Sequence, residues 1–371
     1  MTTGPEVFDF EREFAAKQGA SHAVAVSSCT AAIEISLRAL GLPPGARVLT
    51  STMTFCGAVH AILHAGLQPV LVDVDADTLM PDAETTAAAV RRFGRAGAML
   101  VLHFAGHPAP VVELAEAARL PLTRVVEDAA HALGTTVDGR PVGTISAATC
   151  FSFYATKNLA IGEGGMITTD DPQVADRARR CALHGMSRDA WRRYQPGGGW
   201  RYAVDDAGLK ANMTDLQAAI GRAQLRHLDD WQRRRAALAD RYDTALASIP
   251  GVTPPRAPAD GRHAWHLYVV RITPEFGVHR DELVQRLAER GIDCSVHFIP
   301  VHHHRYFQDA LGPEIGDGFP VADAVFEEIV SLPLYPALRD DQVDRVCFEI
   351  DGLRRARHRV SAPASMGGRV P

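Results

Sequence analysis

Short apolar runs alternate with helical patterns through the first two thirds of the chain. The apolar runs, many of them β-branched, are the strands that we predict, and segments with apolar residues at helical spacing lie between several of them. Short buried strands separated by helices are typical of a mostly parallel sheet with helices on both faces. The predicted strands are Ala23–Val26, Arg47–Leu49, Pro69–Val74, Met99–Phe104, Arg124–Val126, Ala148–Phe153 and Met166–Thr169, and the predicted helices are Ala31–Leu40, Phe55–His64, Glu84–Phe93 and Val111–Ala118.

The last third of the chain follows a different order. A long helical pattern begins after Thr214, a suitable N-cap, and continues to about Ala247. Its apolar residues lie on more than one side, so we expect it to bridge two domains or a subunit interface. A proline-rich linker at 250–258 precedes a strand (Trp265–Ile272), a helix (Asp281–Arg290), a strand (Cys294–Phe298) and a last helix (Asp340–Leu353).

These patterns predict an α/β protein with two domains. The large domain, with the mostly parallel sheet and the long helix, covers residues 1–247, and a smaller α+β domain covers 248–360. The Gly-, Pro- and Ser-rich end at 361–371 indicates a disordered tail. The glycine-rich stretch Gln195–Trp200 indicates a mobile loop.

Composition narrows the classes of function. The 371 residues are 46% hydrophobic and 22% charged, as in an ordinary globular protein, and the net charge of −5 argues against nucleic acid. We interpret the run Arg233–Arg235 as a solvated helix face. No signal peptide and no run of about 18 apolar residues is found, so we expect no membrane segment. Six scattered cysteines without a C-x-x-C pair indicate neither a zinc site nor disulfides and fit a reduced, cytoplasmic setting.

Three segments that follow predicted strands offer the groups that transamination needs. Ser27–Thr30 opens a helix, where backbone N–H groups can bind a phosphate, although a plain N-cap has the same appearance. Asp128 lies at the end of a parallel strand, where it could face a pyridine nitrogen or simply cap a loop, and His131 follows it. Lys157 follows another strand and precedes the turn Gly162–Gly165, so it could form an imine with an aldehyde cofactor. A lone lysine is usually a surface residue, so spacing alone leaves this open.

Together the segments resemble the DegT/DnrJ/StrS family of sugar aminotransferases, a branch of fold type I of the enzymes that use pyridoxal phosphate (PLP). The resemblance covers nearly the whole chain, although family members usually carry a segment ahead of the turn matched here by Thr3-Gly4-Pro5. The motifs, in family order, are Ser27-Ser28-Cys29-Thr30-Ala31, Glu127-Asp128-Ala129-Ala130-His131-Ala132, Phe151–Asn158 with Gly162–Gly165, Asn212–Ala219, Trp265–Leu267 and Ser331–Pro336.

The resemblance implies PLP as cofactor and assigns roles by matching position. The substrate would be a nucleotide-linked keto sugar, and the amino donor an amino acid, with glutamate as the leading candidate. The working unit would be a homodimer with shared active sites. Within the family, Val101–Pro108, the long helix and Ser295–Phe298 resemble the aminotransferase for UDP-linked 4-keto-arabinose, which places His297 near the substrate. The remaining roles are Lys157 for the Schiff base, Asp128 for the pyridinium, His131 beside the ring hydroxyl, Cys29, Thr30 and Ser152 for the phosphate, Phe55 for stacking on the ring, and Asn212 for a phosphate contact from the neighbouring subunit.

Several alternatives follow from the same residues. A keto-cyclitol substrate, as in aminoglycoside assembly, would keep the fold and the site. A dehydratase of the family carries histidine in place of the lysine, so Lys157 argues against it, and a regulatory protein without turnover need not keep Lys157, Asp128 and His131 together. We predict no metal at His302–His304, because three consecutive histidines on an extended segment would point to alternating sides.

Overall fold

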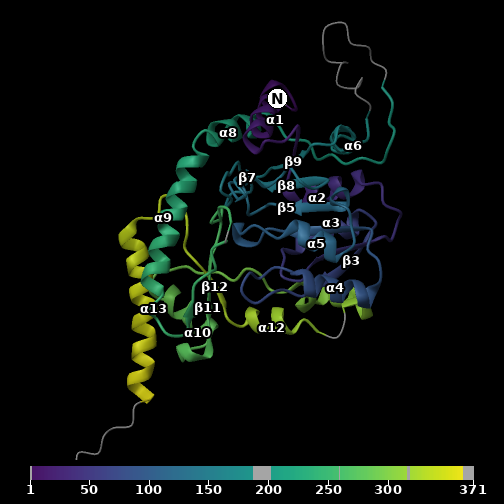
Figure 1. Cartoon of the computed structure of the whole chain (residues 1–371). Helices are drawn as coiled ribbons and strands as arrows, with labels where there is room; N and C mark the ends of the chain where they lie inside the picture. Colours follow the sequence, from purple (N-terminus) through teal and green to yellow (C-terminus); the bar gives the residue numbers. More distant parts are fainter. Residues whose placement is uncertain (1, 187–201, 259, 316–317, 362–371) are drawn as a thin grey trace, which may run out of the picture.

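A seven-stranded sheet forms the centre of the computed structural model, which describes residues 2–186, 202–258, 260–315 and 318–361 (Figure 1). The strand order is β1-β9-β8-β5-β4-β2-β3. The pairs from β8 to β3 are parallel, whereas β9 runs antiparallel to both of its neighbours, so the predicted mostly parallel sheet is confirmed. The strands are β1 (His22–Val26), β2 (Arg47–Ser51), β3 (Gln68–Val72), β4 (Ala98–Leu102), β5 (Val125–Asp128), β8 (Ala148–Ser152) and β9 (Gly165–Thr169).

Helices cover both faces of this sheet. One face packs against α2, α3 and α6, and the other against α4, α5 and, near β1, α1. Each of the four predicted helices of this region is present, with each end within two residues of its prediction. The helices are α1 (Pro5–Gln18), α2 (Cys29–Ala39), α3 (Cys56–His64), α4 (Ala83–Phe93), α5 (Val111–Ala117) and α6 (Pro172–Cys181).

Side chains on adjacent positions of a strand belong to different cores. On β4, Ala98 and Leu100 pack with α2 and α3, whereas Met99 and Val101 pack on the α4 and α5 side. Successive side chains of a strand point to opposite faces, so a strand covered on both sides must be apolar at every position. The continuous apolar runs of the sequence therefore reflect this double burial.

A smaller three-stranded sheet with its own core lies beside the large sheet and is formed by the last third of the chain. The three-stranded sheet has the order β10-β11-β12, and the long helices α9 and α13 lie side by side next to it (Figure 1). The predicted strand at Cys294–Phe298 is wrong, because the segment makes only one bridge, from Ser295 to Ser331, while the strand lies at 329–332. The elements are α8 (Asp215–Leu225), α9 (Leu228–Leu246), β10 (Val252–Thr253), β11 (Tyr268–Ile272), α10 (Arg280–Ala288), η4 (Val301–His303), α11 (Arg305–Leu311), α12 (Pro320–Phe326), β12 (Ile329–Leu332) and α13 (Asp340–Ser361).

The long helical pattern is two helices. Thr214 caps α8 in a capping box with Gln217. The helix is interrupted at residues 226–227, between the end of α8 and the start of α9. The interpretation of Arg233–Arg235 as a solvated face fails at its third residue, because the Arg235 guanidinium is buried and donates to three backbone carbonyl groups. Arg235 is buried because α9 packs against other parts of the chain on more than one side.

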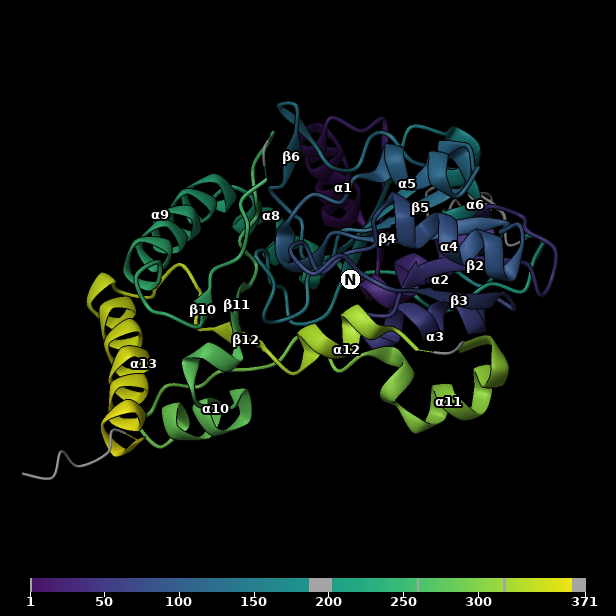
Figure 2. The same cartoon turned by 60° about the horizontal axis from the view of Figure 1, so that its bottom comes forward.

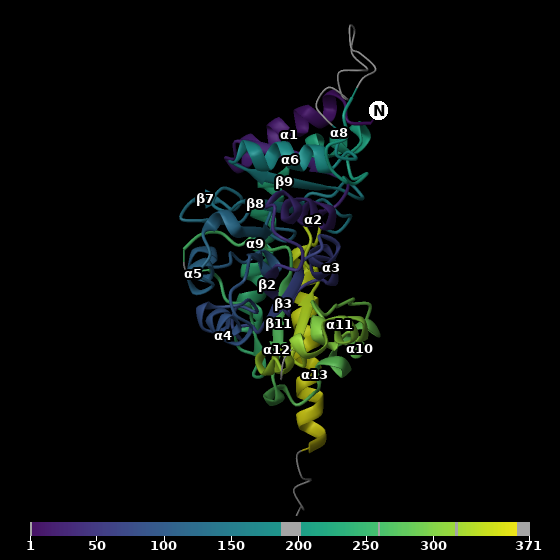
Figure 3. The same cartoon turned by 90° about the vertical axis from the view of Figure 1, so that its right-hand side faces the viewer.

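Two stretches before β12, residues 300–315 and 318–328, lie away from the small sheet and pack on the large one. Figures 2 and 3 show α11 and α12 near α3 and β3, and their apolar residues share a core with these elements. Conversely, α9 packs with α13 in the core of the small sheet. The boundary near residue 247 stays a prediction. Gln195–Trp200 lies outside the described residues, and so does the tail after Ser361, where α13 ends later than predicted. None of the described helices is long and apolar enough to cross a membrane.

Candidate active site

A cavity of ≈ 500 Å³ opens where the parallel strands end. The turns after β1, β5 and β8 meet at this edge of the sheet, and His297 and Phe298 close it from the segment before η4. Carboxyl ends of parallel strands share one edge, and ligands of open α/β sheets bind there. The predicted site residues that line the cavity are Cys29, Thr30, Phe55, Asp128, His131, Ser152, Lys157 and His297.

Asp128 ends β5 with one carboxylate oxygen in use. Its Oδ1 accepts from the Ala130 N–H at 3.0 Å and faces the Cys29 Sγ at 3.8 Å. The side chain is only 4% exposed, and no hydrogen bond to Oδ2 is found among the described residues. Burial raises the pKa of this carboxyl, while Ala130 and the Lys157 charge act in the opposite direction. A buried carboxylate with a free oxygen requires a cationic or N–H partner in the cavity.

Lys157 lies in the hairpin between β8 and β9, and its amine reaches the cavity. Burial lowers the pKa of this amine, opposed by the nearby Cys29 and Asp128 groups. Its Nζ lies 3.4 Å from the His266 Nε2. A lysine with a lowered pKa carries a free amine more often, so it can act as nucleophile and as proton carrier.

His266 is oriented by an amide. The Asn158 Nδ2 donates to the Ala264 carbonyl at 2.8 Å, so its Oδ1 is the atom that faces the His266 Nδ1 at 3.2 Å. The Nδ1 must therefore carry the proton, and the Nε2 is left as an acceptor for the Lys157 amine. Burial lowers the pKa of this imidazole well below its usual value, so the ring is neutral.

His131 is neutral in the same way. Burial lowers its pKa well below the usual value, with the Lys157 charge acting in the same direction. Its Nδ1 accepts from the Ala105 N–H at 3.2 Å, so the neutral ring carries its proton on Nε2. The ring packs against that of His266 with centroids 4.5 Å apart and the two planes tilted by 37°. His131 therefore offers an N–H donor beside the two catalytic candidates.

The start of α2 has the features of an anion site. The Ser28 hydroxyl caps the helix by accepting from the Ala31 N–H at 3.1 Å, so the N-cap is confirmed, and binding of a phosphate at this turn stays a prediction. The first turn of α2 lines the cavity, and its free N–H groups and the positive end of the helix dipole favour an anion there. A Cβ on Gly165 would lie 2.5 Å from the Ser28 backbone, so only glycine lets β9 approach the turn. Thr30 and Ser152 bring hydroxyl groups to the same wall.

Two aromatic side chains and a histidine form the outer wall. Phe55, at the start of α3, is 57% exposed, and its ring lies 6.1 Å from that of Phe298. His297 holds its ring by a 2.8 Å contact between Nδ1 and the Ser331 hydroxyl, and burial lowers its pKa to about 4. An exposed ring at a cavity mouth is available for a planar ligand.

Asn212 does not line the cavity of its own chain. It pairs with Val26 next to the β1 turn, and its Nδ2 donates to the Thr2 and Thr3 hydroxyl groups at 3.0 and 2.9 Å. Its role toward a neighbouring subunit stays a prediction.

Sequence reasoning assigned no role to several other lining residues. His266 is the most informative of them, and the Trp265–Leu267 motif was its only signal. Its position depends on long-range packing, since Lys157 and His266 are more than a hundred residues apart. Further lining residues without an assigned role are Tyr154, Thr156, Glu163 and Phe298.

The residues present fit PLP. Asp128 keeps a free buried oxygen for the pyridinium, Lys157 provides an amine, His131 provides an N–H donor, and the α2 turn provides a phosphate site. Asp128, Lys157 and His131 each already have a partner within the protein, the Ala130 N–H, the His266 Nε2 and the Ala105 N–H, so these groups are oriented before any ligand binds.

Comparisons with known proteins identify the family and its cofactor. The profile of the DegT/DnrJ/EryC1/StrS aminotransferase family matches residues 1–351. The spore coat polysaccharide biosynthesis protein SpsC of Bacillus subtilis is 49% identical over 348 residues, 93% of this chain and 89% of that protein. The structure of Spr1654 from Streptococcus pneumoniae in its PMP form has a TM-score of 0.87 at 30% identity over 96% of this chain and 94% of that one, and a PLP form is also known. The aminotransferase TlmJ from Streptoalloteichus hindustanus has a TM-score of 0.84 at 34% identity, with 96% and 92% covered. The chain therefore belongs to the DegT/DnrJ/EryC1/StrS aminotransferase family and is a PLP-dependent aminotransferase.

Proposed function

We propose that this enzyme moves an amino group from an amino acid, with glutamate as donor, to a keto sugar carried on a nucleotide, in amino-sugar biosynthesis. The observation that carries the proposal is the cavity itself, where Lys157 and Asp128 lie beneath a wall of neutral hydrogen-bonding groups. Such a wall suits the hydroxyl groups of a sugar. In support, SpsC is named for polysaccharide biosynthesis, and Spr1654 is described as a sugar aminotransferase. All six cysteines are free, which fits the cytoplasm.

The chemistry divides between the cofactor and the chain. PLP, when bound, supplies the carbonyl group that takes the amino group and the ring that stabilises the adjacent negative charge. Asp128 places a buried negative charge at the end of β5, and His131 donates from Nε2. The free Lys157 amine would take the proton from the donor carbon and would deliver it to a different atom than the one it came from, with His266 Nε2 holding Nζ in place. Two half-reactions on one site predict ping-pong kinetics.

The test is a substrate panel. The PLP-loaded enzyme is incubated with glutamate and each of a set of nucleotide-linked keto sugars, UDP-4-keto-arabinose included, and products are identified by mass spectrometry. We expect a mass change of ketone to amine for at least one nucleotide sugar, with none for Lys157→Ala. Amination of a keto-cyclitol, with every nucleotide sugar untouched, would overturn the proposal.

We also propose a homodimer with shared active sites. Phe8 on α1 and Leu216 and Ile220 on α8 are 49%, 65% and 48% exposed, so these packed helices present apolar side chains on the surface of a single chain. Such side chains fit an interface between copies. Among the described residues that line the cavity, Lys157 is the only lysine or arginine. An anionic substrate would therefore need cationic side chains from outside this set, which a second subunit could provide.

Complementation tests the shared site. Lys157→Ala and Asn212→Ala variants are mixed under conditions that exchange subunits. If Asn212 acts across the interface, a mixed dimer regains one intact site and the mixture regains activity. A monomer by light scattering, or no activity after proven exchange, would count against it.

A further inference from the structure

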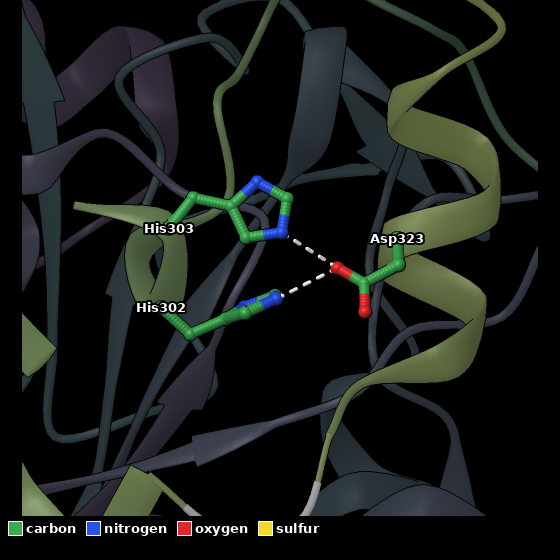
Figure 4. A group of neighbouring side chains, drawn as sticks. All are labelled: His302, His303 and Asp323. Atoms are coloured by element: carbon green, nitrogen blue, oxygen red, sulfur yellow. Dashed lines mark hydrogen bonds and ion pairs between the residues drawn. The ribbon is translucent and has the colours of Figure 1, made fainter.

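Two histidines and an aspartate meet outside the catalytic cavity. The His302 Nε2 and the His303 Nε2 lie 2.8 and 2.7 Å from the same oxygen, Oδ1 of Asp323 (Figure 4). The expected extended conformation of this histidine run is wrong, because Val301–His303 forms the 3₁₀ turn η4. The turn lets adjacent imidazoles converge on α12, which removes the geometric reason for expecting no metal there.

His302 and the helix that carries Asp323 are held in place by further contacts. The Thr52 Oγ1 lies 2.7 Å from the His302 Nδ1, and the His302 carbonyl accepts from the Gln308 Nε2 at 2.9 Å. The Asp73 carboxylate accepts from two N–H groups at the start of α12, which fixes the helix that carries Asp323. Metal-binding histidines characteristically use their second ring nitrogen in this way.

We propose that His302, His303 and Asp323 bind one divalent cation of the zinc class. Their three ligand atoms lie within 4.8 Å of one another, and no other such group of three is found in the part of the chain that the structure describes. Two imidazole nitrogens and one carboxylate oxygen form a set that suits Zn²⁺, with a fourth position for water. His303 and Asp323 side chains are 34% and 47% exposed, so this position faces solvent.

Binding requires a change of tautomer at both histidines. Without an ion, each Nε2–H donates to the Asp323 oxygen. With an ion, both Nε2 atoms must be free, so each ring proton moves to Nδ1. At His302 this proton is then donated to the Thr52 Oγ1, which the 2.7 Å contact permits. The ion would then link η4 to α12, two segments that pack on the large sheet. The alternative is that the three side chains are joined only by these two hydrogen bonds and bind no ion.

The experiment uses the full-length enzyme with PLP bound, treated with a chelator and titrated with Zn²⁺ by calorimetry. We expect one tight site per chain, weakened at least tenfold by Asp323→Asn and by His303→Gln. His304→Gln is the matched control, because this neighbouring histidine is not part of the cluster, and it should bind like the wild type. Zn²⁺ should raise the midpoint of thermal unfolding in the wild type and the control only.

The outcomes separate an ion site from a hydrogen-bonded pair of segments. Co²⁺ should give visible absorption bands of a four-coordinate site in the wild type that are absent from Asp323→Asn. The proposal is overturned if Zn²⁺ binds no tighter to the wild type than to His303→Gln and Asp323→Asn. Because both substituted side chains are partly exposed and the test measures binding, loss of aminotransferase activity has no part in the outcome.

Discussion

Replacing Asp128 by asparagine should place a donor where the cofactor needs an acceptor. The Oδ1 position receives the Ala130 N–H and faces the Cys29 thiol, so the asparagine oxygen must take this position. Burial raises the pKa of that thiol well above its usual value, which keeps it a donor. The new NH₂ group is therefore forced to the place of Oδ2, where it cannot hold a protonated pyridine nitrogen.

The size of the effect follows from burial. Removing one partner of a buried charge pair costs about 3–5 kcal/mol, whereas an exposed pair is worth about 0–1 kcal/mol. Asp128 is 4% exposed, so the buried range applies. At about 1.4 kcal/mol for each factor of ten, kcat should fall by about 10²- to 10⁴-fold.

The assay compares kcat of Asp128→Asn with that of Glu163→Gln, measured on the aminated product or on the keto acid from glutamate. Glu163 lines the same cavity but is exposed, so losing its charge should change kcat by less than about fivefold. Circular dichroism and PLP content establish that both variants fold and bind the cofactor. A drop of less than about tenfold for Asp128→Asn would refute the orientation argument.

Borohydride reduction of the PLP-loaded enzyme should attach the cofactor to Lys157, one of three lysines in the chain, and peptide mapping to another lysine would contradict the assignment. Glu127→Leu should lower the free energy of unfolding by about 3 kcal/mol relative to Glu127→Gln, which keeps an acceptor for the buried His103; equal urea midpoints would disprove this. Acid should also destabilise the fold. Burial lowers the pKa of His131 and His297, so below pH ~6.5 the unfolded chain binds more protons than the folded one. The stability that the neutral rings contribute above that pH is lost as pH falls, down to about pH 4 for His297. His297→Gln should therefore weaken the dependence of the free energy of unfolding on pH, and urea unfolding at several pH values measures this.

Local patterns predicted the sheet because burial acts on every strand position. The apolar runs at β5 and β8 marked strands covered on both faces. Asp128 at the end of β5 and Lys157 in the turn after β8 lie at one edge of the sheet, because the two strands are parallel neighbours. The capping residue Thr214 was readable because its hydrogen bond spans three residues. Where the pattern was weak, at Cys294–Phe298, it predicted a strand that pairing does not support.

The sequence by itself determined the fold class, from the order of apolar runs and helical patterns, and the family, from several motifs in order. The same motifs pointed to Lys157 and Asp128, which the structure places in the cavity. Only the tertiary structure decided which distant groups meet. Asn158 fixes the ring of His266 toward Lys157, and Asp323 receives two histidines about twenty residues away, because α12 packs beside η4. Such contacts depend on how separate elements pack, and no periodicity along the chain encodes a distance between elements that are far apart in sequence.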